Sequence, residues 1–122
     1  MISFDHVHLC CTDLDASIQF WTEALGATFI RRRKFGTADG AVVSLQGVQI
    51  FFKKIPEDSP LANASARGLN HLGIRVPDPN ALAENLVNNY GCTLLNKASE
   101  DCSFVATPHG VTFELMRIGA DI

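Results

Sequence analysis

The sequence of 122 residues has neither a long apolar run nor an excess of basic residues. No apolar stretch approaches the roughly 20 residues that span a bilayer. Residues 1–15 include acids and histidines where the apolar core of a signal peptide would lie. The formal net charge of −3 leaves no basic footprint for nucleic acid. These absences predict a cytoplasmic protein that binds neither membranes nor nucleic acids.

The cysteines show no ligand spacing. The four cysteines, at positions 10, 11, 92 and 102, form no CxxC pair and no arrangement typical of a structural zinc site. Thiols stay reduced in the cytoplasm. We therefore expect four free cysteines that act mainly as small apolar residues.

Positive charge is concentrated in one run, Arg31-Arg32-Arg33-Lys34. Four residues are few for a nucleic-acid patch. On a strand, such a run is either a solvated edge or part of an anion-binding wall, and the sequence leaves both interpretations open.

What the sequence does contain is an internal repeat. An offset of 65 residues (71 − 6 = 65) pairs His6 with His71, Asp13 with Asp78 and Gly26 with Gly91. Near the end of each half the offset becomes 63 (114 − 51 = 63), which pairs Phe51 with Glu114. A two-residue deletion in a hairpin of the second half accounts for the change.

Each half predicts one strand, one helix and three further strands. The segments DHVHLCC and NHLGIRV alternate as strands do. Asp13 and Asp78 are N-cap candidates, and Gly26 and Gly91 have the character of left-handed helix ends. The further strands are expected at 27–34, 40–45 and 47–54, and at 92–97, 102–107 and 110–117.

The predicted fold class is therefore α+β, with two βαβββ modules that form a cupped, mostly antiparallel sheet around one cavity. With 47% hydrophobic and 19% charged residues, the composition suits one globular domain, 1–122. Module one spans 1–54, the Pro- and Ala-containing linker 55–68, and module two 69–118.

Strand alternation assigns the side chains to two faces. Apolar residues such as Leu9, Ile74 and Phe113 face the helix, so the other face is open. Four repeat-related residues share the open face: His6, Phe51, His71 and Glu114. Two imidazoles and one carboxylate suit a divalent Zn, Fe, Mn, Ni or Co ion and leave coordination positions for substrate. We predict His6, His71 and Glu114 as metal ligands and Phe51 as an apolar wall for the ligand.

Other residues of the open face are candidates for the chemistry. His8 is two residues beyond His6, about 7 Å along the strand, and is the predicted acid–base residue. Arg75 is predicted to bind an anionic group of the substrate with its fork of donors. Lys53 is predicted to assist it.

The segment DHVHLCCTDLDASIQFWTEALG resembles the opening pattern of the vicinal oxygen chelate superfamily, and NHLGIRVPDPNALAENLVNNYG is a weaker copy. GVTFELMR is similar to that superfamily's last strand, whose Glu is the closing metal ligand. The superfamily includes glyoxalase I, fosfomycin-resistance and bleomycin-resistance proteins, and extradiol dioxygenases. The resemblance implies the same ligands, His6, His71 and Glu114, and often a homodimer, in which modules pair within or between chains.

The resemblance leaves the reaction open. Glyoxalase I has an acid at the position of Phe51, which argues against ordinary glyoxalase I activity. The leading expectation is a metal-dependent enzyme that acts on a small, oxygen-rich, anionic substrate in a lyase, isomerase or transferase reaction. The alternatives are an Fe(II) extradiol-type dioxygenase and a metal-free small-molecule binding protein of the bleomycin-resistance type.

Overall fold

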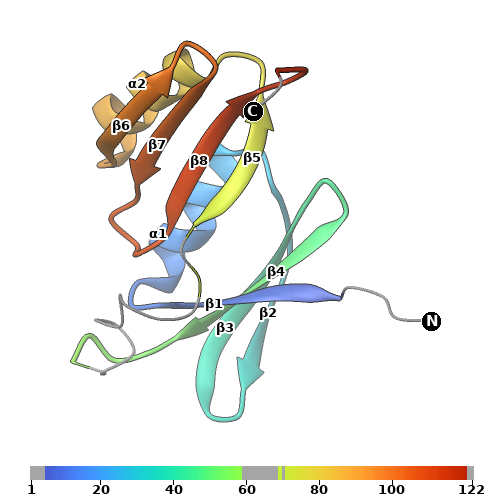
Figure 1. Ribbon diagram of the computed structural model, residues 1–122. Coiled ribbons are helices and arrows are strands. Elements are labelled where there is room, and N and C mark those ends of the chain that lie inside the picture. Colours follow the sequence, from blue (N-terminus) through green and yellow to red (C-terminus); the bar gives the residue numbers. More distant parts are fainter. Residues whose placement is uncertain (1–4, 59–68, 70, 121–122) are drawn as a thin grey trace. The chain divides into compact units, whose positions relative to one another are not determined.

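The computed structural model describes residues 5–58, 69 and 71–120. The chain forms two compact units, Met1–Ala64 and Ser65–Ile122, and each contains one four-stranded sheet (Figure 1). Residues 59–68, most of the predicted linker, lie outside the described residues. No helix among the described residues is long and apolar enough to cross a membrane.

The first unit has the strand order β1-β4-β3-β2. Its elements are β1 (His6–Cys11), α1 (Leu14–Gln19), the π-helical turn η1 (Phe20–Ala24), β2 (Thr28–Phe35), β3 (Ala38–Leu45) and β4 (Val48–Lys54). β1 and β4 are parallel, and the other two pairs are antiparallel.

The second unit repeats this topology with the order β5-β8-β7-β6. Its elements are β5 (Leu72–Val76), α2 (Pro79–Tyr90), β6 (Thr93–Ser99), β7 (Cys102–Ala106) and β8 (Thr112–Arg117). β5 and β8 form the parallel pair. The predicted α+β class and the two βαβββ modules are confirmed.

Strand register confirms the alignment of the two halves. His8 lies opposite Phe51 in the first sheet, and Gly73 lies opposite Glu114 in the second. Since 8 + 65 = 73, Phe51 and Glu114 have equivalent neighbours, as the two offsets require.

The helix ends agree with their sequence signals. The carboxylates of Asp13 and Asp78 accept hydrogen bonds from the backbone N–H groups of Ala16 and Ala81, at 3.0 and 3.1 Å. Such a cap stabilises a helix by about 1 kcal/mol. Gly26 follows the first helical segment with φ of 75°, and Gly91 caps α2 with φ of 72°. These positive φ values suit glycine because it has no Cβ.

The first helix is not regular along its whole length. It changes from α to π geometry at Phe20, which is 2% exposed, and its neighbour Trp21 is 3% exposed. Consecutive residues of an α-helix point about 100° apart, and a π turn locally changes that spacing. The wider turn accompanies the burial of both adjacent aromatic side chains.

Each sheet has one face buried against its helix, as alternation predicts. The buried strand residues of the first unit include Leu9, Ala41, Val43, Ile50 and Phe52, and those of the second include Val105, Phe113 and Leu115. Leu86 of α2 is fully buried. The opposite face of each sheet carries the polar and aromatic candidates.

Thiol burial generates a testable prediction. Cys10 is exposed, whereas Cys11, Cys92 and Cys102 are buried. Burial raises the pKa of the Cys11 and Cys92 thiols, which disfavours the reactive thiolate. We expect a thiol reagent at neutral pH to modify Cys10 first and the other three only after unfolding, as mass spectrometry would measure. Fast modification of Cys11 in native protein would contradict this, and Cys10→Ser is the control.

Candidate functional site

The open face of the second unit brings two predicted metal ligands together. His71 Nε2 lies 3.4 Å from Glu114 Oε1, and the side chains are 34% and 19% exposed. His71 directly precedes β5 and Glu114 lies on β8, so the parallel strand pair makes them neighbours. Phe104 of β7 contacts the His71 ring edge-on, with centroids 5.6 Å apart.

A thiol holds the other oxygen of this carboxylate. Cys102 Sγ lies 3.4 Å from Glu114 Oε2, an ordinary distance for a sulfur donor. Burial and this hydrogen bond raise the pKa of the Cys102 thiol, so the S–H form is the donor. One carboxylate oxygen is thus held by Cys102, while the other faces His71.

Gly73 lies beside Glu114, with the end of the Met116 side chain packed against it. A Cβ at Gly73 would lie 2.9 Å from Met116 Cε and 3.8 Å from Glu114 Oε1. The equivalent position in the first unit holds His8. The repeat position that carries an imidazole in the first unit is thus occupied by the end of the Met116 side chain in the second.

In the first unit, His6 is held between a carboxylate and an aromatic ring. Its Nδ1 lies 2.7 Å from Asp5 Oδ2, and its ring stacks on Phe51 at 3.9 Å between centroids. A carboxylate on one ring nitrogen is the usual second partner of a metal-binding histidine, because it orients the other nitrogen. Phe51 thus stacks on His6, and its role as an apolar wall for a ligand stays a prediction.

His8 lies in the same cluster. Its ring is 6.0 Å from that of His6 and 4.6 Å from that of Phe35, between centroids. Desolvation lowers the pKa of His8 from its ordinary value, and electrostatic repulsion from the neighbouring His6, Lys53 and Arg33 side chains lowers it further. The neutral imidazole is favoured, which is the form that accepts a proton.

The predicted anion-binding Arg75 is engaged with backbone. Its Nη1 donates to the carbonyl oxygens of Arg117 and Ala120 at 2.9 and 2.7 Å. Arg117 in turn pairs with Asp101 at 2.8 Å. The role of Arg75 toward a substrate remains a prediction, as do those of His8 and Lys53.

The donor chemistry of the site fits a divalent metal ion. Two ligand atoms that each bind an ion at about 2.1 Å lie about 3 Å apart at right angles, close to the 3.4 Å between His71 Nε2 and Glu114 Oε1. His6 has the carboxylate partner expected of a ligand. Within the described residues, no group of three or more His, Cys, Asp or Glu side chains is placed to hold one ion.

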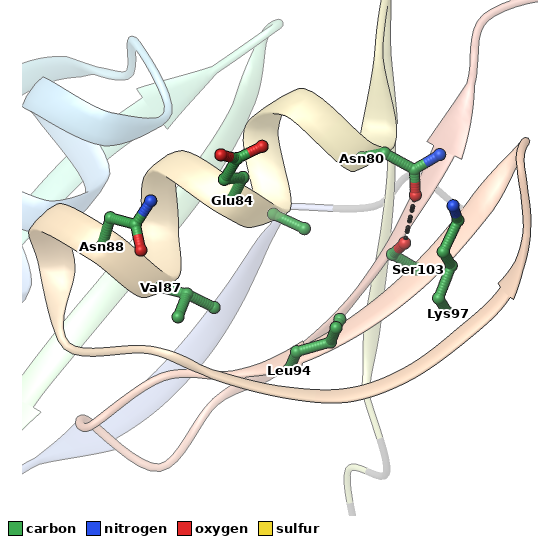
Figure 2. A pocket seen from close by; sticks show the side chains of 8 residues that line it. Asn80, Glu84, Val87, Asn88, Leu94, Lys97 and Ser103 are labelled. Carbon is green, nitrogen blue, oxygen red and sulfur yellow. Dashed lines mark hydrogen bonds between the residues drawn. The ribbon is translucent and has the colours of Figure 1, made fainter.

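A pocket of the second unit lies on the opposite face of the sheet, between α2 and β6 (Figure 2). Asn80 and Ser103 are joined across it by a hydrogen bond of 2.9 Å, and Val87 and Leu94 form its apolar part. It contains neither His71 nor Glu114, so it is separate from the candidate site.

The model of a family described as "Glyoxalase-like domain" matches residues 1–116. The chain belongs to the glyoxalase-like domain family. This confirms the resemblance to the vicinal oxygen chelate superfamily, within which the fold occurs. Among curated proteins, none matches the sequence significantly.

Solved structures share this glyoxalase-like fold at low identity. Glyoxalase I of Leishmania major has a TM-score of 0.78 and 20% identity, covering 96% of this chain and 87% of its own. A glyoxylase/bleomycin resistance protein/dioxygenase domain from Frankia sp. EAN1pec has 0.74 and 23%, covering 98% and 96%. A variant of the fosfomycin resistance protein FosX from Listeria monocytogenes, complexed with Mn(II) and 1S,2S-dihydroxypropylphosphonic acid, has 0.75 and 17%, covering 96% and 93%.

The sequence did not single out Cys102, Phe104 or Phe35 as site residues, whereas Arg33 belongs to the basic run for which an anion-binding wall was one of two open interpretations. Cys102 and Phe104 alternate with the buried Ser103 and Val105 on β7, so alternation could have placed them beside Glu114. Phe35 and Arg33 are separated by one residue on β2, but no pattern showed that they stack. The predicted homodimer is untested.

Two open-face glycines give a matched stability prediction. At Gly40 an added Cβ would lie 2.4 Å from the Phe35 ring and 2.6 Å from the Phe52 carbonyl oxygen, whereas at Gly73 it meets chiefly the flexible end of Met116. We expect Gly40→Ala to lower the free energy of unfolding by about 1–3 kcal/mol and Gly73→Ala by less than about 1 kcal/mol. Urea unfolding would measure both. Equal losses of unfolding free energy in the two variants would contradict the tight packing of Phe35 on Gly40.

Proposed function

We propose that the protein is a metal-dependent enzyme in which His6, His71 and Glu114 hold one divalent ion that chelates a small, oxygen-rich, anionic substrate. The observation that carries the proposal is the approach of His71 Nε2 to Glu114 Oε1 at 3.4 Å on the open face. The repeat adds His6 at the position equivalent to His71, and a carboxylate already orients its ring.

The family and its structural neighbours support this proposal. The neighbours include glyoxalase I and a FosX variant complexed with Mn(II) and a dihydroxypropylphosphonic acid. Phe51 stands in place of a fourth ligand, which argues against the glyoxalase I reaction. A lyase, isomerase or transferase reaction is the class that we propose.

The residues divide the work by their chemistry. When bound, the ion would polarise substrate oxygens as a Lewis acid. His8 lies beside His6 and is positioned to exchange a proton with the substrate. Phe51 excludes water beside His6, and Cys102 fixes the rotamer of Glu114 by holding Oε2.

Metal content tests the ligand set. Protein purified without chelators or a histidine tag should carry about one equivalent of a first-row metal per chain, measured by atomic emission. We expect His71→Ala and Glu114→Gln to lose it, because each removes a ligand. His109→Ala, which removes a histidine outside the set, should retain it.

The identity of the bound metal distinguishes between the candidate reactions. Mn, Ni or Zn would favour lyase or transferase chemistry, and Fe with oxygen consumption on catechols would favour the dioxygenase. If the protein neither contains nor takes up Mn, Fe, Ni or Zn, the three-ligand site is wrong and a metal-free binding protein is the better account.

The Cys102 thiol should affect metal affinity without being a ligand. Cys102→Ala removes the donor to Glu114 Oε2, and loss of such a supporting contact lowers metal affinity by about tenfold or more. Calorimetric titration of metal-stripped protein with Mn(II) would measure this. Cys102→Ser should recover much of the affinity, because its hydroxyl can donate, and Cys92→Ala is the control for loss of a buried thiol. An unchanged Kd for Cys102→Ala would show that Glu114 needs no such support.

A further inference from the structure

The basic run of β2 is divided between the two faces of the first sheet. Arg32 pairs with Asp15 of α1, and Lys34 pairs with Asp39 of β3. Arg31 and Arg33 point to the opposite, open face, and no carboxylate pairs with either among the described residues. The cations on the helix-covered side are therefore neutralised, while those beside the candidate site are not.

Arg33 is held on an aromatic platform. Its Cζ lies 4.3 Å from the centroid of the Phe35 ring and 5.8 Å from that of Phe51. Its Nε donates to the Lys34 carbonyl oxygen at 3.3 Å. A guanidinium stacked on a ring keeps its outer edge for planar recognition of an oxyanion.

The position of the Phe35 ring depends on glycine at position 40, which has no side chain. Gly40 lies between Arg33 and Lys53 in one row across β2, β3 and β4. The Phe35 ring fills the space above Gly40, where a Cβ would lie only 2.4 Å from it. Arg33 and Lys53 are two strands apart, about 10 Å by strand spacing, so Phe35 forms an apolar floor between two cations.

On the same open face, these aromatic rings contact the candidate residues His8 and His6. Phe35 contacts His8 at 4.6 Å between centroids, and Phe51 stacks on His6. Arg33, Phe35, His8, Phe51 and His6 thus form one continuous surface within the first unit. We call this set of five residues the β2 wall.

We propose that the β2 wall binds an oxyanion group of the substrate, a carboxylate or a phosphonate, with Arg33 as the specificity-determining residue and Lys53 as the second cation. Arg33 takes this role in place of Arg75, whose Nη1 is committed to two backbone carbonyls. That the oxyanion belongs to a substrate rests on the proposed function. That the first unit binds an oxyanion at all rests only on the contacts within the β2 wall.

The test uses the whole protein, stripped of metal by dialysis, so that no anion binds through an ion. Phenylphosphonate and benzoate are titrated separately into ¹⁵N-labelled protein, with benzamide as the neutral probe of similar shape. We expect one or both anions, but not benzamide, to shift resonances of β2 and β4. Whichever of phenylphosphonate and benzoate binds more tightly indicates whether the site prefers a phosphonate or a carboxylate.

Variants on the two faces of β2 provide the matched comparison. We expect Arg33→Gln to weaken binding roughly tenfold, because a charged donor pair is lost. Arg32→Gln removes the same charge from the opposite face and should change Kd less than about twofold. Arg33→Lys keeps the charge without the fork and should be intermediate, and Phe35→Leu should weaken binding by removing the platform.

Several results would overturn the proposal: neither anion binds the wild type, Arg33→Gln and Arg32→Gln bind alike, or Arg75→Gln rather than Arg33→Gln abolishes binding. Thermal melts of the exposed-residue variants verify folding. Metal uptake is measured separately, so that a failure of the anion-site proposal can be told from a failure of the proposed metal site. Arg33-dependent anion binding without metal uptake would support the β2 wall and contradict the metal enzyme, and the reverse pattern would do the opposite.

Discussion

The parallel pairing of the first and last strands of each unit is the constraint on which the candidate site depends. β5 and β8 are hydrogen-bonded neighbours, although His71 and Glu114 are 114 − 71 = 43 residues apart in the sequence. A parallel pair needs a crossover of a dozen or more residues, and here a helix and a hairpin provide it. If β5 occupied the opposite edge beside β6, two strands would separate these two side chains.

The two units use this scaffold for different purposes. Equivalent rows carry His8 beside Phe51 in the first sheet and Gly73 beside Glu114 in the second. The first row is filled with aromatic contacts that hold His6. In the second row the end of the Met116 side chain packs against Gly73, and Cys102 holds one oxygen of the Glu114 carboxylate. Divergence at two repeat positions thus gives the first unit an aromatic cluster around His6 and the second a carboxylate beside His71.

Alternation along β2 also separates cations that pair with carboxylates from cations that do not. Arg32 joins the sheet edge to α1 through Asp15, while Arg33 is turned toward the open face and stacks on Phe35. Exposed ion pairs contribute little to stability. The pairing of Arg32 neutralises charge on the helix-covered side, whereas Arg33 and Lys53 are cations near His8 on the open face. The four consecutive basic residues 31–34 look alike in the sequence, but in the sheet they have different partners on its two faces.

The sequence by itself determined the repeat, the βαβββ order, the helix caps at Asp13 and Asp78, and the open-face positions of His71 and Glu114. These follow from local rules: side-chain period, capping chemistry and the φ that glycine permits. Tertiary structure alone decided which side chains touch, because contacts between strands depend on register and rotamer. Only it placed Cys102 against Glu114, turned Arg75 toward the carbonyls of Arg117 and Ala120, and laid Phe35 over Gly40 beneath Arg33.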